Sequence, residues 1–278
     1  MSRRFFLAVV QLHSTDELEH NLERCRFWIR EAARKEVEFV LLPEDFAFLA
    51  RDEKDKQNLS DKQLQKIVNM VREEAIRHRI YILAGGHPVR VEGSDKLHNT
   101  STLFSPEGEV IENYQKIHLF DAKLPSAPPI EESSVAEAGN NIKMVETPLC
   151  HVGFSICYDL RFPELYRRLA TEGAELLTIP AAFALMTGKD HWETLVRARA
   201  IENQCYVAAP AQWGRHSETR HSFGRAMICD PWGAVIASVS EGEGIAIAEF
   251  NPEYLEKVRQ MLPCHQHIRH DLFSIGKK

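Results

Sequence analysis

One cysteine stands where this sequence could present a nucleophile. Residues 153–164 read GFSICYDLRFPE, a short apolar strand that reaches Cys157 and then enters a helix that Pro163 can begin. Such an elbow exposes a side chain beside backbone N–H groups, where a thiol can attack a carbonyl carbon. We also expect the helix N-terminus to lower the pKa of this thiol. The alternative is that Cys157 is one more small buried residue of the core.

Two charged residues follow other predicted strands and could assist this cysteine. Glu44 comes just after the apolar strand 37–42, and Lys116 ends the second strand of a hairpin over 99–118. The carboxyl ends of strands in open α/β sheets collect catalytic groups. A carboxylate there can accept the thiol proton, and a fixed cation can stabilise an oxyanion. Taken alone, each residue is more commonly an ordinary surface charge.

Strands and helices alternate along the first half of the chain. Residues 4–12 and 37–42 read as buried strands joined by an amphipathic helix, which makes a parallel βαβ unit. A second helix and the strand 80–84 follow, after which the glycine pair 85–86 is expected to break the chain. The hairpin over 99–118 closes this half.

The second half repeats this order of elements without repeating its residues. An irregular stretch over 122–141 is expected to wall the site, and another βαβαβ run then ends in a strand at 205–211. A hairpin over 225–238 follows. We predict one domain over 1–278, an α/β fold in which helices cover two sheets as a four-layer αββα sandwich. The tail over 262–278 is expected to lie at an oligomer interface.

The composition limits the class of partner and the compartment. A hydrophobic fraction of 44% is ordinary for a globular protein with a sizeable core, and a net charge of −6 argues against a nucleic-acid surface. No apolar run is long enough to span a membrane, and no signal sequence is visible, so we expect a cytoplasmic protein that binds no membrane.

The cysteines and histidines give no sign of a disulfide framework or a metal centre. The six cysteines contain no C-x-x-C pair and read as reduced thiols. His265, His267 and His270 read as a solvated tail, because no acidic or cysteine partner stands beside them at ligand spacing. We therefore expect no metal and no cofactor.

Three segments together resemble the signatures of the nitrilase superfamily of carbon–nitrogen hydrolases. They stand in that family's order and spacing: LLPE at 41–44, YQKIHLFD at 114–121 and GFSICYDLRFPE at 153–164. The resemblance covers nearly the whole chain and implies an amidohydrolase of linear amides. Cys157 would form a thioester, and Glu44 would act as general base. Lys116 and the backbone N–H of Tyr158 would hold the oxyanion.

The family often carries a second glutamate between the lysine and the cysteine. By similarity this residue maps onto Glu132, where it would orient Lys116 and the substrate, and Glu131 is the competing assignment. A lysine between two carboxylates should remain protonated, which suits it to electrostatic work.

Later segments narrow the resemblance to one branch. Residues 182–193 and 197–207 resemble amidases that act on ω-amides of α-keto dicarboxylates, and 209–216 is more similar to the deaminated glutathione amidases than to the ω-amidases. The resemblance implies hydrolysis of deaminated glutathione to 2-oxoglutarate and Cys-Gly. The alternatives are an ω-amidase acting on 2-oxoglutaramate or on another small aliphatic amide or carbamoyl compound, and a catalytically silent scaffold of the same fold.

The candidate substrate-binding residues suit a substrate with two carboxylates. Arg161 can pair bidentately with one carboxylate or form a salt bridge at the helix start, and Phe183 and Thr187 come from the loop after the neighbouring strand. We expect Arg215 and His216 to meet a second, distal carboxylate. The expected partners are therefore a small-molecule amide and further copies of this chain in a homodimer or higher homo-oligomer.

Overall fold

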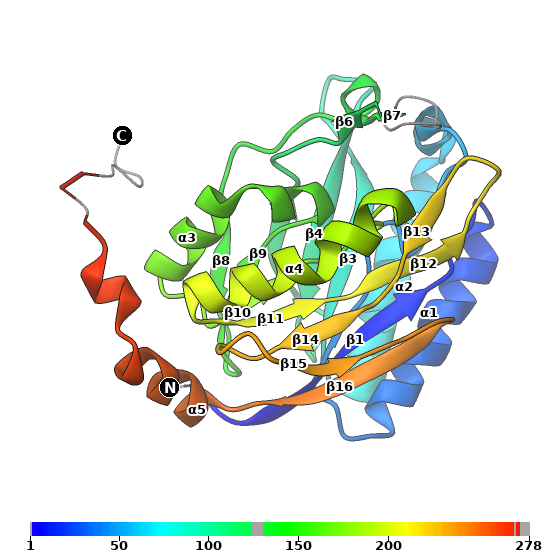
Figure 1. Cartoon of the computed structure of the whole chain (residues 1–278). Helices are drawn as coiled ribbons and strands as arrows, with labels where there is room; N and C mark the ends of the chain where they lie inside the picture. The colour runs from blue at the N-terminus through cyan, green and yellow to red at the C-terminus, as the bar shows by residue number, and fades with distance from the viewer. Residues whose placement is uncertain (1, 124–129, 270, 273–278) are drawn as a thin grey trace.

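Two β-sheets pack face to face and carry helices on their outer faces in a computed structural model (Figure 1). The structure describes residues 2–123, 130–269 and 271–272. Helices α1 (Leu18–Ala33) and α2 (Asp61–His78) cover the first sheet, and α3 (Pro163–Thr171) and α4 (Leu185–Asn203) cover the second. This arrangement confirms the predicted α/β sandwich.

The first sheet has eight strands. Their order is β13-β12-β1-β2-β3-β4-β5, and β16 pairs with β1 outside this path. The bounds are β1 Phe5–Leu12, β2 Phe39–Leu41, β3 Tyr81–Arg90, β4 Leu97–Phe104, β5 Val110–Gln115, β12 Ala211–Arg215, β13 His221–Phe223 and β16 Gly244–Phe250.

The second sheet has six strands in the order β15-β14-β11-β10-β9-β8. The bounds are β8 Met144–Glu146, β9 His151–Phe154, β10 Leu176–Thr178, β11 Tyr206–Ala209, β14 Met227–Cys229 and β15 Val235–Ser238. Strands β6 (Asp121–Ala122) and β7 (Ile130–Glu131) form a small separate pair. The remaining helices are α5 (Pro252–Met261) and the 3₁₀ turns η1 (Glu53–Asn58), η2 (Glu132–Ser134), η3 (Cys157–Arg161) and η4 (Cys264–His267).

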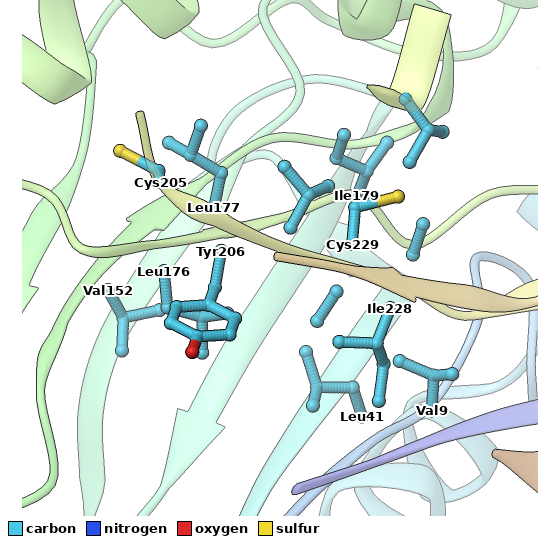
Figure 2. Packing of buried hydrophobic residues seen from close by; sticks show 14 of the residues in the cluster. Val9, Leu41, Val152, Leu176, Leu177, Ile179, Cys205, Tyr206, Ile228 and Cys229 are labelled. Atoms are coloured by element: carbon cyan, nitrogen blue, oxygen red, sulfur yellow. The ribbon is translucent and has the colours of Figure 1, made fainter. Parts of the chain in front are cut away.

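Alternate residues of β1 belong to two different cores. Leu7 and Val9 join the cluster between the sheets, whereas Ala8 and Val10 join the cluster beneath α1 and α2. A strand buried on both faces has this continuous apolar sequence. Figure 2 shows Val9 of the first sheet near Ile228 of the second, within the cluster that joins the two sheets.

Two predicted strand boundaries are wrong. The glycine pair 85–86 does not break the chain, because β3 continues to Arg90 with a shift of register between Ala84 and His87. A side chain at Gly85 would place its Cβ only 1.9 Å from the Leu42 carbonyl oxygen, so glycine lets the two strands approach closely here.

The strand predicted over 205–211 is likewise two strands that belong to different sheets. Strand β11 lies in the second sheet, whereas β12 pairs in parallel with β1 of the first sheet. Pro210 stands between them, and it cannot donate to a strand ladder. The chain therefore crosses from one sheet to the other at this proline. None of the helices in the described ranges is both long and apolar enough to cross a bilayer.

Candidate active site

Four of the predicted site residues lie together at the ends of their elements. The Nζ of Lys116 is 2.9 Å from Oε1 of Glu44 and 2.8 Å from Oε2 of Glu132. Glu44 follows β2, Lys116 follows β5 and Glu132 begins η2, while Cys157 begins η3 after β9. All four side chains are buried. One cation thus lies between two carboxylates beside a thiol.

Backbone and amide donors fix both carboxylates. Asn99 Nδ2 donates to Glu44 Oε1 at 2.9 Å and to Glu132 Oε1 at 3.0 Å. The Ala182 N–H donates to Glu44 Oε2 at 2.9 Å, and the Phe120 N–H donates to Glu132 Oε2 at 2.7 Å. Each of these four carboxylate oxygens therefore has at least one donor, which leaves little freedom for either side chain to rotate.

Cys157 is held in an uncommon backbone conformation. Its φ is +45°, in the left-handed region that a non-glycine residue enters at a cost of about 1–3 kcal/mol. Its N–H donates to the Pro180 carbonyl at 2.9 Å, and its thiol lies beside the Glu44 carboxylate. Tyr158 follows at the start of a 3₁₀ turn, where N–H groups have no partner within the turn.

The charges at the site correct one expectation about Cys157. Burial raises the pKa of the thiol well above its usual value, and the neighbouring Glu44 carboxylate raises it further, so the thiol pKa is raised overall and not lowered as expected. Burial would also raise the pKa of Glu44, but the Lys116 charge and hydrogen bond lower it. Burial alone would lower the pKa of Lys116, but Glu132 and Glu44 raise it well above its usual value. The resting site therefore pairs a neutral thiol with an ionised base.

Asp159 connects the cysteine turn to the segment that carries Lys116. Its fully buried carboxylate accepts from the Ile156 N–H at 2.8 Å and from the Tyr114 hydroxyl at 2.7 Å. The N–H and Nδ1 of His118 donate to its other oxygen at 3.1 and 2.7 Å. The Asp159 carboxylate thus holds in place the backbone just before Cys157 and the residues on both sides of Lys116.

Two cavities meet at Cys157, with Phe120 and Ala182 lining both of them. The first, which we call the Arg161 cavity, is about 230 Å³. Its other lining residues are Tyr158, Arg161, Phe183, Ala184 and Thr187. The Arg161 guanidinium lies 4.9 Å from the centre of the Phe183 ring.

The second cavity, which we call the Arg220 cavity, is about 330 Å³ and contains the charged groups. Its lining residues besides the shared three are Glu44, Asp45, Glu53, Lys56, Lys116, Ile130, Glu132 and Arg220. Lys56 Nζ lies 2.9 Å from Asp45 and 3.0 Å from Glu53, and Arg220 Nη1 lies 2.7 Å from Glu53. A second ion-pair chain thus adjoins the one around Lys116.

The structure separates the two expected carboxylate-binding positions. Arg161, Phe183 and Thr187 line one cavity at the cysteine, as a substrate-binding role requires. Arg215 and His216 line neither cavity.

Arg215 and His216 interact instead with their own neighbourhood. His216 Nδ1 donates to the Ser14 carbonyl at 2.7 Å, and burial lowers its pKa to about 3, so it carries no charge for an anion. Arg215 is exposed, and its Nε donates to the Ser217 carbonyl at 3.2 Å. The arginine from this segment that lines a cavity together with the cysteine is Arg220.

The two candidates for the second glutamate differ in position. Glu132 lies against Lys116, whereas the Glu131 side chain is exposed at the end of β7. The predicted wall over 122–141 falls partly on residues 124–129, which lie outside the described residues. Ile130 and Glu132 from its described part do line the Arg220 cavity.

Sequence reasoning missed Asn99, Asp159 and Arg220. Asp159 stands within the quoted cysteine segment and was available as a buried acid, but nothing in the sequence assigns Asn99 or Arg220 to this edge of the sheet. Across the described ranges, no cluster of histidine, cysteine or acidic side chains has the arrangement of a metal site.

Three comparisons relate the whole chain to known proteins. A model of the carbon-nitrogen hydrolase family matches residues 6–260. A deaminated glutathione amidase from Synechocystis sp. is 45% identical over 95% of this chain and 97% of its own length. The Mus musculus protein of that name is 42% identical over 97% of this chain and 85% of its own. The crystal structure of the C. elegans NitFhit protein matches with a TM-score of 0.94 and 39% identity, covering 99% of this chain and 67% of that one.

Proposed function

The chain belongs to the carbon-nitrogen hydrolase family, and from this premise we propose that it hydrolyses deaminated glutathione to 2-oxoglutarate and Cys-Gly. The reaction class is that of an amidohydrolase acting on a small-molecule amide. The observation that carries the proposal is Lys116, held between Glu44 and Glu132 beside the Cys157 thiol. The substrate is supported by the names of relatives that are 41–45% identical over most of the chain.

In the first half-reaction the thiol becomes the nucleophile only as it attacks. Its raised pKa keeps it protonated at rest, and the ionised Glu44 takes the proton while Sγ bonds to the amide carbon. The oxyanion forms between the Lys116 ammonium and the Tyr158 N–H. Glu44 then returns the proton to the departing amine as the carbon–nitrogen bond breaks, which leaves a thioester on Cys157.

Water completes the cycle through the same groups. Glu44 takes a proton from water as the oxygen attacks the thioester carbon, and Lys116 again faces the oxyanion. The carbon–sulfur bond breaks, and the thiol recovers its proton. Glu132 and Asn99 touch Lys116 or Glu44 rather than the reacting carbon, so we assign them to positioning these two groups.

The test follows both products and the intermediate. We expect purified protein to release Cys-Gly and 2-oxoglutarate from deaminated glutathione, and a rapidly quenched sample to carry the 2-oxoglutaryl group on Cys157 by peptide mass spectrometry. Cys157→Ala, which keeps the small buried volume, is the matched control without turnover. Release at the parent rate from this variant, or an adduct on Cys150 or Cys205, would show that a different nucleophile acts. A protein without turnover on any amide would be the silent scaffold.

We also propose that residues 1–278 form one folding unit and that its C-terminal segment mediates formation of a homo-oligomer. We place this protein in the cytosol. The family model spans 6–260 without a break. Met261 and Leu262 are 55% and 52% exposed, an unusual state for neighbouring apolar side chains. All six cysteines are free thiols, which suits a reducing compartment. Light scattering on the parent and on Met261→Ser would test the assembly, and a monomeric parent would refute it.

A further inference from the structure

The position of Glu44 decides which cavity receives which half of a substrate. Glu44 lines the Arg220 cavity and not the Arg161 cavity. The departing amine must lie within hydrogen-bond reach of the carboxylate that protonates it. The leaving group therefore extends into the Arg220 cavity, and the acyl group that remains on Cys157 extends into the Arg161 cavity.

Arg220 has unused hydrogen-bonding capacity in that cavity. Its Nη1 donates to the Ala50 carbonyl at 2.8 Å and pairs with Glu53. Within the described part of the chain, its Nε and Nη2 donate no hydrogen bond. Its side chain is only 19% exposed, so these donors are largely shielded from bulk water. A guanidinium held by one nitrogen can still offer its other N–H groups to a carboxylate.

The neighbouring charges hold Arg220 in place and leave the Nε and Nη2 side of its guanidinium available. Lys56 is already occupied by Asp45 and Glu53, on its two sides. Glu53 in turn holds the Nη1 side of Arg220. Lys56 and Arg220 balance Asp45 and Glu53, whereas Lys116 faces both Glu44 and Glu132, so the Nε and Nη2 side of Arg220 is the part of the cavity that an anion can approach.

We infer that Arg220 binds the carboxylate at the far end of the leaving group and thereby selects amides whose amine portion ends in an anion. This inference rests on the proposed function, because it takes Cys-Gly as the leaving group. In place of Arg215 and His216, which line neither cavity, it takes a residue from the same segment that lines one of them. Arg161 is left to the α-keto carboxylate of the acyl group.

The experiment uses three substrates with one acyl group. Deaminated glutathione, its C-terminal amide and 2-oxoglutaramate all give the same 2-oxoglutaryl thioester, but only the first leaving group ends in a carboxylate. Deacylation is therefore common to all three, and differences in kcat/KM report on the leaving group. The variants are Arg220→Met, Arg215→Met and a control, Arg51→Met, which removes an exposed arginine paired with Asp16.

We expect Arg220→Met to lower kcat/KM for deaminated glutathione about ten-fold more than for 2-oxoglutaramate, as loss of a partly buried charge contact should. In this variant the C-terminal amide should be as good a substrate as the acid. Arg51→Met should keep the ratios of the parent. Equal losses on all substrates, or a selective loss in Arg215→Met instead, would overturn the assignment.

The parent protein gives a test that does not depend on the variant folding. It should prefer deaminated glutathione to the C-terminal amide about ten-fold, and equal kcat/KM for these two would overturn the inference even if Arg220→Met were insoluble. A parent that hydrolyses 2-oxoglutaramate but not deaminated glutathione would contradict the proposed substrate. If the parent instead hydrolyses deaminated glutathione and its C-terminal amide with equal kcat/KM, the proposed substrate stands and only the assignment of Arg220 fails.

Discussion

Replacing Lys116 by methionine should damage stability and turnover for separate reasons. The substitution keeps the length of the side chain and removes a cation that lies 2.9 and 2.8 Å from two carboxylates. Removing one member of a buried ion pair typically costs about 3–5 kcal/mol, because the remaining charge is left unpaired. Here two carboxylates remain, and Asn99 keeps them adjacent. We expect a loss of unfolding free energy of about 4 kcal/mol at pH 7.

The pH dependence of that loss identifies its cause. Without the Lys116 charge, burial raises the pKa of Glu44 above its value in the unfolded chain. The folded state then binds the proton more tightly, so this contribution to stability is present at low pH and is lost as the pH rises. The deficit of Lys116→Met relative to the parent should therefore shrink between pH 7 and pH 5.

Urea unfolding at both pH values measures this, and a matched variant provides the scale. Lys143→Met removes a lysine that pairs with Glu112 at 3.1 Å at a partly exposed position, so it should cost less than about 1 kcal/mol. Turnover of Lys116→Met should fall about 10²–10³-fold through loss of an oxyanion donor. Stability within about 0.5 kcal/mol of the parent would refute the view that Lys116 compensates both glutamates, and near-parent turnover would refute its role at the oxyanion.

Two further outcomes follow from the buried groups. Asp159→Asn should lower the unfolding free energy by about 1–3 kcal/mol, because an amide cannot accept from all of the Ile156, Tyr114 and His118 donors. The same variant should lower kcat more than it raises KM. Unchanged kcat in steady-state assays would show that Asp159 is not needed to position the catalytic groups. Burial lowers the pKa of His87 to about 4 and that of His216 to about 3, so the unfolded chain takes up protons first as the pH falls below 6.5. Stability should then decline with a slope approaching about 2.7 kcal/mol per pH unit for two protons, and equal urea midpoints at pH 7 and pH 5 would contradict this.

The sequence predicts the site residues that follow strands better than the site residues that lie on loops. Glu44, Lys116 and Cys157 each follow a predicted strand, and the carboxyl ends of strands collect catalytic groups, but it is the resemblance of their three segments to the nitrilase signatures that raises them above ordinary surface or core residues. Arg220 stands just before β13, on a turn whose direction depends on a pairing with β12 that periodicity does not reveal. The sequence therefore predicts Arg215 and His216 as the distal carboxylate site and does not predict Arg220, the arginine of the same segment that lines a cavity.

The wrong predictions share a physical origin in tertiary contacts. Glycines 85–86 ordinarily indicate a turn, but here the absent side chains admit the backbone that leads to Glu44. The helix end by itself predicts a lowered pKa for the Cys157 thiol. In the structure, burial and the Glu44 charge both act against ionisation and outweigh it.

The pairing of β1 bears on how the chain emerges from a ribosome. Phe5 pairs with Phe250 and Gln11 with Gly244, so one side of this apolar strand stays open until most of the chain has been synthesised. An unpaired apolar strand edge is a template for aggregation, and contacts so distant in sequence form slowly. A nascent chain stalled before residue 244 should therefore be retained by chaperones rather than fold as a stable N-terminal half.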